Sequence, residues 1–166
     1  MPTVRIRTWG DPVLSQVGAP IEEIDDTLLA LVDDMIQTMY DAPGVGLAAQ
    51  QVGVLRQVFV YDVGEGPGVL LNPEIVETSG EWTYEEGCLS VPGLFFPISR
   101  PEAVHIRGLD LDGNEVAHEG HELLGRVFQH EYDHLQGMLL LERLDKATRK
   151  QAMRALRERA MAERST

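Results

Sequence analysis

The chain has 166 residues, 43% of them hydrophobic, and a formal net charge of −13 at pH 7. This length supports one core and is short for two, so we expect a single domain over residues 1–166, and the acidic balance argues against DNA binding. The only cysteine, Cys88, cannot form an internal disulfide, which favours a cytoplasmic protein.

The N-terminal stretch, residues 1–17, carries arginines but no continuous apolar run. It therefore predicts no export signal, and no later segment has the length and hydrophobicity that cross a bilayer. Asp25 or Asp26 can then cap a helix over about residues 27–40, in which apolar residues recur at helical spacing. We expect this helix to be structural.

A glycine-rich joint follows this helix. Residues 44–51 read GVGLAAQQ, in which two glycines permit close backbone approach to a ligand and small residues permit tight packing. The stretch lacks the complete glycine patterns of phosphate-binding loops. Taken alone, it indicates only a tight joint between elements.

The middle of the chain predicts short strands separated by turns. Asn72-Pro73 interrupts one strand pattern, and a turn at residues 110–114 lets the chain pair back on itself. Strands and helices do not alternate, so the expected class is α+β, with antiparallel β-sheets packed around a central helix and with an N-terminal and a C-terminal helix. The expected strands cover residues 57–63, 69–71, 75–78, 98–100, 103–109 and 115–117.

The segment His118-Glu119-Gly120-His121 contains two histidines at a spacing that could ligate a metal ion. It lies, however, at the predicted turn that opens the next helix, where an acidic residue favours the helix N-terminus. We interpret it as a surface loop.

The next helix carries the motif around which the chain is organised. Apolar residues at helical spacing lead into Gln129-His130-Glu131-Tyr132-Asp133-His134, and Gly137 supplies a stop. His130 and His134 lie one turn apart on the same face, so both imidazoles can hold one metal ion. Glu131 lies beside them and can accept a proton from water without ligating the metal, as a hydrolase requires.

Two histidines and a water leave one position of a tetrahedral metal site to be filled. The third histidine of one metalloprotease class is absent, because its position holds Leu140. Glu158 or Glu163 could serve as in another class, although both lie in a basic, solvated stretch. Cys88, in the segment EGCLS at residues 86–90, is the remaining candidate.

The chain ends in a basic segment. Asp145 can cap a last helix over about residues 145–163, after an apolar connector at residues 138–141. From Glu142 onward there are eight Lys or Arg and four Asp or Glu, a balance of +4, which leaves −17 for the preceding residues. Both lysines of the chain lie in this segment.

Three separated stretches together resemble the signature motifs of the peptide deformylase family, GxGLAAxQ, EGCxS and HExDH. They are GVGLAAQQ at residues 44–51, EGCLS at 86–90 and HEYDH at 130–134, and each matches without departure. One such motif is moderately specific, whereas three in this order are highly specific. The resemblance implies a metal-dependent hydrolase that removes the formyl group from the N-terminal formylmethionine of nascent polypeptides.

The resemblance also implies the metal site. Cys88, His130 and His134 would be the ligands, with a water molecule completing the set. The family uses Fe²⁺, which Zn²⁺, Ni²⁺ or Co²⁺ can replace. The residues alone would have suggested zinc, because zinc favours tetrahedral sites of cysteine and histidine.

Catalytic and substrate roles carry over in the same way. Glu131 would be the general base, and the Gln51 side-chain amide and the backbone N–H of Leu89 would donate hydrogen bonds to the oxyanion. The backbone of Gly46 would pair with the peptide. Arg100 resembles a family arginine near the substrate, although an exposed arginine on an extended strand explains the residue nearly as well. An apolar pocket for the methionine side chain would draw on Val45, Tyr84, Leu123 and Val127.

The resemblance gives the basic C-terminal helix a candidate partner. In the family such a helix can dock on the ribosome near the peptide exit, and a balance of +4 against −17 suits contact with rRNA. An ordinary solvated helix face explains the same arginines.

Two alternatives remain open. A zincin-type metallopeptidase would take Glu158 or Glu163 as its third ligand and would keep its metal without Cys88. A closed structural or sensing site would need a fourth protein ligand, and none of the remaining histidines is persuasive in that role.

Overall fold

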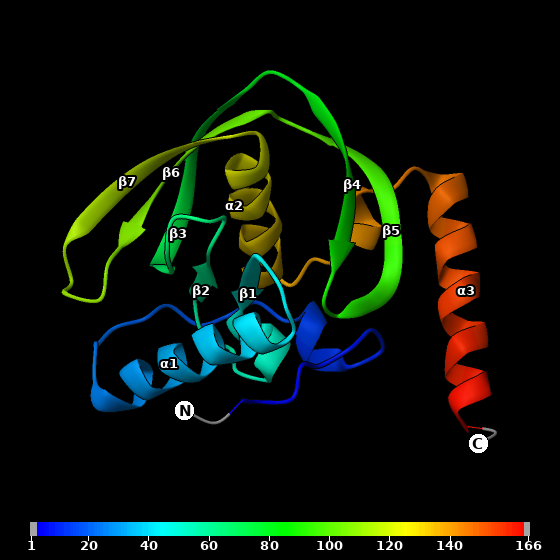
Figure 1. The fold of residues 1–166 in the computed structure, drawn as a ribbon, viewed down its shortest axis with the longest axis horizontal. Coiled ribbons are helices and arrows are strands. Elements are labelled where there is room, and N and C mark those ends of the chain that lie inside the picture. Colours follow the sequence, from blue (N-terminus) through cyan, green and yellow to red (C-terminus); the bar gives the residue numbers. More distant parts are fainter. Residues whose placement is uncertain (1–2, 165–166) are drawn as a thin grey trace.

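A computed structural model describes residues 3–164 of the chain. Within that range the chain forms three α-helices and seven strands, together with three short 3₁₀ turns (Figure 1). The helices are α1 (Asp26–Asp41), α2 (Glu122–Leu135) and α3 (Lys146–Arg164). The strands are β1 (Gly46–Ala48), β2 (Val58–Tyr61), β3 (Gly68–Ser79), β4 (Trp82–Cys88), β5 (Val91–Arg100), β6 (Ala103–Leu109) and β7 (Glu115–His121).

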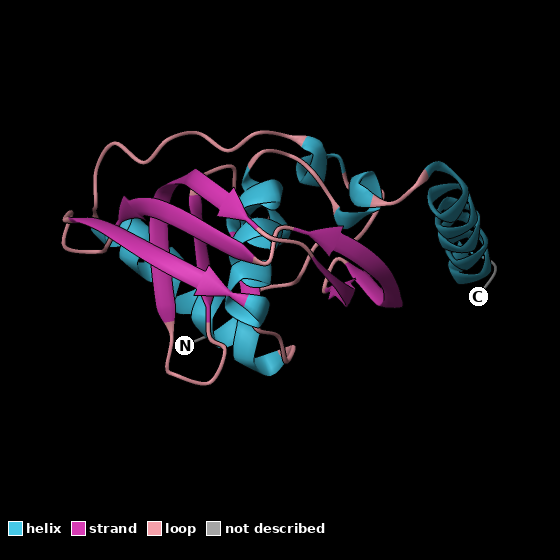
Figure 2. Ribbon diagram, turned by 90° about the horizontal axis from the view of Figure 1, so that it is seen from above, coloured by secondary structure: helices cyan, strands magenta, loops and turns pink. Residues whose placement is uncertain are grey.

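The strands form two antiparallel sheets. β1, β2, β3, β6 and β7 make one sheet in the order β1-β2-β3-β6-β7, and β4 pairs with β5 in a separate two-stranded sheet. α2 packs against β1, β2, β6 and β7 and lies between the larger sheet and the β4–β5 pair (Figures 1 and 2). The expected α+β class with antiparallel sheets and three helices is confirmed.

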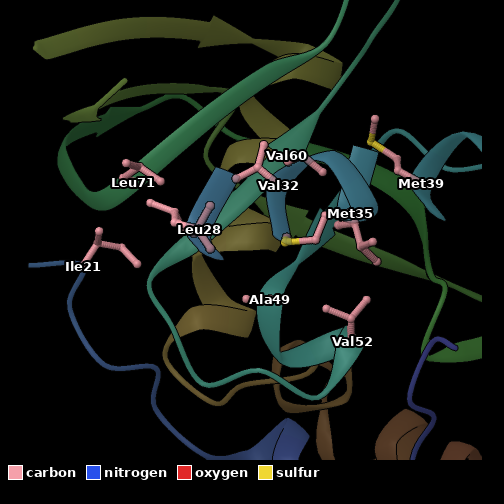
Figure 3. Packing of buried hydrophobic residues seen from close by; sticks show 11 residues of the cluster. Ile21, Leu28, Val32, Met35, Met39, Ala49, Val52, Val60 and Leu71 are labelled. Carbon is pink, nitrogen blue, oxygen red and sulfur yellow. The ribbon is translucent and has the colours of Figure 1, made fainter. Parts of the chain in front are cut away.

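The two faces of the larger sheet are covered by different helices. Successive side chains of a strand point to opposite faces, so Val60 of β2 joins α1 while its neighbour Phe59 joins α2. On the α2 side, Phe59 packs with Phe128 of α2 at a ring separation of 6.3 Å. On the α1 side, Figure 3 shows the apolar cluster of Ile21, Leu28, Val32, Met35, Met39, Ala49, Val52, Val60 and Leu71.

Helix α1 begins where the sequence predicts. The Asp25 side chain accepts a hydrogen bond from the N–H of Leu28 at 2.9 Å, which satisfies one of the donors left free in the first turn. Leu28, Val32 and Met35 then repeat at helical spacing and are fully buried. The helix therefore has a local start signal and a face that packs on the sheet.

β3 is longer than expected, because Asn72-Pro73 does not end it. Asn72 adopts a φ of +48°, which asparagine tolerates better than most residues. Its side chain accepts from the N–H of Ile21 at 2.7 Å and donates to the carbonyl of Ile21 at 2.9 Å. The pairing of β3 with β6 shifts register at this point and then continues.

The histidine-containing segment at residues 118–121 is a strand, so the prediction of a surface loop was wrong. It continues β7, which pairs with β6 as far as Ala103 opposite His121. Residues three apart on a strand point to opposite faces. His118 and His121 therefore cannot share one metal ion, and His118 instead packs near Phe128 at a ring separation of 6.0 Å.

Helix α3 lies at one end of the molecule, beyond β5 (Figures 1 and 2). Asp145 caps it as predicted, accepting from the N–H of Thr148 at 2.8 Å. Ala152 and Leu156 are buried in a third apolar cluster with Val91 and Ile98 of β5. None of the described helices combines the length and the hydrophobicity needed to cross a membrane.

Candidate metal centre and active site

Cys88, His130 and His134 converge where α2 meets the turn between β4 and β5. Their candidate ligand atoms all lie within 4.8 Å of one another. The two Nε2 atoms are 3.1 Å apart, and Sγ of Cys88 is 3.4 Å from Nε2 of His134. Over residues 3–164, no other trio of His, Cys, Asp or Glu side chains has a spacing that fits an ion.

The local structure explains why these three side chains meet. α2 places the histidines one turn apart, and the β4–β5 pairing shifts register between Gly87 and Cys88, where the strand ends. The Phe95 ring lies against Gly87, because a Cβ at Gly87 would come within 2.4 Å of that ring. The carbonyl of Leu135, at the end of α2, accepts hydrogen bonds from the side chains of Gln50 and Gln57 at 3.1 and 3.0 Å.

The donor set fits a divalent metal ion. One thiol and two imidazoles are ligands that zinc and other divalent transition metals accept. Nδ1 of His130 donates to Oε2 of Glu86 at 2.8 Å, which leaves Nε2 with the lone pair that a ligand needs. Glu86 therefore orients the ring of His130, which is the usual role of a carboxylate that accepts from a metal-binding histidine.

The two imidazoles differ in their affinity for a proton. Burial, together with the nearby His130 ring, holds the pKa of His134 well below its usual range. Burial also opposes the charged form of His130, but Glu131, Cys88 and Glu86 outweigh it and raise the pKa of His130 well above its usual range. A bound cation would take the place of the proton that His130 attracts.

Glu131 is held beside the metal site in an unusual environment. Its side chain is buried, and Oε1 has no hydrogen-bond partner within residues 3–164. Burial raises the pKa of Glu131 to about 7, against the opposing effect of His130. A carboxyl group with such a pKa exchanges protons readily near neutral pH, which suits a general acid–base.

A cleft of about 620 Å³ opens onto this centre. The Gln51 side-chain amide donates to Ser90 Oγ at 3.1 Å and lies 3.8 Å from Sγ of Cys88, so it faces the same space. The cleft is lined by nearly all the residues that the sequence assigned to catalysis or substrate: Val45, Gly46, Gln51, Tyr84, Cys88, Leu89, Leu123, Val127, His130 and Glu131.

Arg100 requires a correction. We expected it near the substrate, but its side chain is 4% exposed and does not line the cleft. It donates two hydrogen bonds to Glu86, at 2.9 and 2.8 Å, and one to Asp133 at 2.8 Å. A guanidinium that is buried in this way cannot turn to a substrate without losing all three of these charged hydrogen bonds, and buried charges depend on such partners.

Sequence reasoning missed three charged residues around the centre. Arg126 lines the cleft, donates to Oε1 of Glu86 at 3.0 Å and stacks over Trp82 at 5.5 Å. Asp133 and Arg143 form a bidentate pair at 2.8 and 2.9 Å. Arg126 could have been found, because it precedes His130 by one helical turn and so shares its face.

Glu158 and Glu163, the alternative ligands, lie on α3 (Figure 1). Neither belongs to the trio formed by Cys88, His130 and His134. The arrangement needed for a zincin-type peptidase is therefore not the one that the structure favours.

The site as a whole defines a class of protein. A thiol and two imidazoles that can hold an ion, a buried glutamate beside them and an open cleft are the parts of a metal-dependent hydrolase. A family model described as polypeptide deformylase matches residues 3–150. The chain belongs to that family.

Individual relatives agree with this assignment. A peptide deformylase of Clostridium botulinum (strain Alaska E43 / Type E3) is 50% identical over 141 residues, which are 85% of this chain and 96% of the relative. The crystal structure of a peptide deformylase from Legionella pneumophila superposes with a TM-score of 0.92 at 38% identity, covering 99% of each chain. That of Ehrlichia chaffeensis peptide deformylase in complex with actinonin gives 0.91 at 38% identity, covering 96% and 98%. The protein is thus a hydrolase that removes the formyl group from the N-terminal methionine of peptides.

Proposed function

We propose that Cys88, His130 and His134 hold one divalent ion, Fe²⁺ in the cell, and that Glu131 is the general acid and base of deformylation. The observation that carries this is the convergence of the three ligand atoms beside a buried carboxylate in one cleft. Zn²⁺, Ni²⁺ or Co²⁺ are suitable substitutes for such ligands. When bound, the ion supplies a Lewis acid that polarises the formyl carbonyl and acidifies water.

Proton transfer falls to Glu131. Its carboxylate accepts a proton from the attacking water and returns it to the amine of the departing peptide. Burial keeps bulk water from competing for this group, and Gly46 allows it to approach β1, because a Cβ at Gly46 would lie 2.5 Å from Oε2 of Glu131.

The charge that develops on the formyl oxygen needs donors. Gln51 is oriented for this role, because its Oε1 accepts from the N–H of Ala48 at 3.0 Å and its NH₂ group then faces Cys88 and Ser90. The backbone N–H of Leu89, in the turn after Cys88, is the second donor. Loss of one such donor costs on the order of 10²-fold in rate.

The substrate, an N-formylmethionyl nascent peptide, would lie along β1. This strand is an edge of the larger sheet, so the backbone of Gly46 can pair with an extended peptide. Val45, Tyr84, Leu123 and Val127 then offer apolar surface to the methionine side chain. Arg100 has no part in this binding.

The general base is tested with Glu131→Ala and Glu131→Gln. Both variants should keep the metal and lose release of formate from formyl-Met-Ala-Ser by roughly 10²-fold or more. Protein should be purified without oxygen, because a cysteine-ligated ferrous site is sensitive to oxidation. Glu74→Gln, which changes an exposed carboxylate paired with Arg107, is the control. Undiminished turnover in either Glu131 variant would remove the assignment.

The ligand set is tested with Cys88→Ala. We expect the metal content of this variant to fall far below one per chain, because two imidazoles alone bind an ion weakly. Glu158→Ala is the matched control and should keep its metal. If Cys88→Ala keeps its metal and Glu158→Ala loses it, the third ligand is Glu158 and not Cys88.

We also propose that residues 1–166 form one catalytic domain in the cytoplasm and that α3 docks on the ribosome. α3 carries exposed basic side chains, among them Arg149, Lys150, Arg154 and Arg157, at one end of an acidic molecule. Changing these four residues to Glu should abolish co-sedimentation with ribosomes while formate release from a short peptide stays at the parent level. Unchanged co-sedimentation would assign α3 a purely structural role.

A further inference from the structure

A continuous chain of charged hydrogen bonds joins the C-terminal segment to the metal ligand His130. Nδ1 of His130 donates to Glu86 at 2.8 Å, and Arg100 holds both oxygens of Glu86 at 2.9 and 2.8 Å. Arg100 also donates to Oδ2 of Asp133 at 2.8 Å. Arg143 closes the chain by donating to both oxygens of Asp133, at 2.9 and 2.8 Å.

The members of this chain come from separate elements. Glu86 lies on β4, Arg100 ends β5, and Asp133 lies on α2 between the two metal-binding histidines. Arg143 ends the 3₁₀ turn Leu140–Arg143, which precedes α3. The chain therefore crosses from the segment before α3 to the side of α2 that holds the ligands.

Arg143 is much more exposed to solvent than the other members of this chain of hydrogen bonds. The side chains of Glu86 and Arg100 are each 4% exposed and that of Asp133 is 7% exposed, whereas that of Arg143 is 42% exposed. Water cannot stand in for a missing partner at the buried members, so their positions depend on one another, although Arg126 also donates to Glu86. Arg143 is the member that can be changed without burying an unpaired charge at its own position.

We propose that Arg143 is a positioning residue for the metal centre. By holding both oxygens of Asp133 it fixes the oxygen that orients Arg100, and Arg100 in turn fixes the carboxylate that orients the His130 ring. Arg143 touches neither the metal site nor the cleft. The inference rests on the proposed metal site and adds to it a residue that acts through three others.

The geometry of the Arg143–Asp133 pair explains why position 143 needs arginine to orient Asp133. A guanidinium fork matches a carboxylate with two parallel hydrogen bonds, whereas a lysine ammonium supplies the charge from a single point. Arg143→Lys should therefore keep the charge and lose part of the orientation. Arg143→Ala should lose both.

The test measures how tightly the centre holds a metal. Cobalt-loaded Arg143→Ala protein should release its ion to a chelator roughly 10-fold faster than the parent, since outer partners of metal-binding histidines typically contribute 10- to 100-fold in affinity. Its cobalt absorption bands should shift, because the His130 ring is no longer held in one orientation. Arg143→Lys should release cobalt at a rate between those of the parent and Arg143→Ala. If the alanine variant does not fold, the lysine variant is compared with the parent instead.

The control is Arg154→Ala, which removes one exposed positive charge from the same end of the molecule. It should release cobalt at the parent rate. If the Arg143 variants melt at a lower temperature but keep the parent release rate and absorption bands, Arg143 only tethers the C-terminal segment and the proposal is wrong. Equal acceleration by Arg154→Ala would also overturn it, because charge alone would then explain the effect.

Cys88→Ala separates this inference from the metal site on which it rests. If Cys88→Ala keeps its metal, the proposed ligand set fails. If Cys88→Ala loses its metal while the Arg143 variants behave as the parent does, the ligand set stands and only the positioning role fails.

Discussion

At position 46 a side chain as small as that of alanine would meet the carboxylate of Glu131. The added Cβ would lie 2.5 Å from Oε2 and 3.0 Å from Cδ of Glu131. Gly46 and the Glu131 side chain are both buried, so the carboxylate would have to move away from the water that we propose it activates. Because a displacement of about 1 Å at a catalytic group costs on the order of 10²-fold, Gly46→Ala should lose activity by that factor.

A displaced Glu131 and a lost metal ion would both reduce the activity of Gly46→Ala, so the two causes must be distinguished. Formate release and metal content should be measured on the same sample, and the metal content should equal that of the parent. Displacement of the base should lower kcat, and the proposed pairing of the Gly46 backbone with the peptide should make a disturbance of that pairing appear in KM. A variant with parental kcat would show that Glu131 tolerates the added methyl group.

Several outcomes at the residue scale were readable from the sequence, and others were not. The two histidines and Glu131 belong to one helical motif, so local spacing was enough to nominate them, whereas Cys88 was nominated by the resemblance of three separated stretches to the family. Arg100 was misassigned because its partners, Glu86 and Asp133, lie 14 and 33 residues away in the sequence. No residue close to Arg100 in the sequence indicates that these carboxylates are its partners. Arg143 was missed for the same reason.

At the scale of elements, one glutamate side chain contacts both the end of β7 and the start of α2. Glu102 accepts a hydrogen bond from the N–H of Glu122 at 3.1 Å, and it contacts the His121 ring at 3.2 Å. Glu102, followed by Glu119, raises the pKa of His121 above its usual value. Glu102→Gln should therefore lower that pKa, as followed by NMR titration of the imidazole.

The sign of the accompanying stability change follows from the raised pKa of His121. The pair stabilises the folded protein below the pKa of an unfolded histidine, and this contribution disappears as the pH rises through the higher pKa of the folded state. The cost of Glu102→Gln should consequently shrink from pH 6 towards higher pH. Glu115→Gln, at the other end of β7, is the control, and a His121 pKa unaffected by Glu102→Gln would contradict the prediction.

Element boundaries were predictable where local chemistry sets them. Asp25 starts α1, and β6 covers residues 103–109 as expected. β5 was underestimated, because the expected strand began only at Ile98, after Pro97, whereas β5 begins at Val91 and contains both Pro92 and Pro97. In a two-stranded sheet one side of each strand lacks a partner, so proline is tolerated there, and that depends on tertiary pairing rather than on the residues themselves.

For the whole molecule, the third apolar cluster joins α3 to the β4–β5 pair that carries Cys88. Leu156 is 4% exposed and packs there with Val91 and Ile98. Leu156→Ala should lower the free energy of unfolding by about 2 kcal/mol, because it removes buried apolar contacts and leaves a cavity. Urea denaturation would measure this, with the exposed neighbour changed in Arg157→Ala as the control. A midpoint equal to that of the control would mean that α3 does not pack on the body in solution.

Lys146 and Lys150, the only lysines of the chain, both lie exposed in the first turns of α3. Reagents that acylate amines will find no other side chain to modify, apart from the terminal amino group. A fluorophore or cross-linker attached through either lysine would sit on α3 and leave the cleft untouched. Covalent adducts trapped through these two amines would therefore report directly which neighbour faces α3.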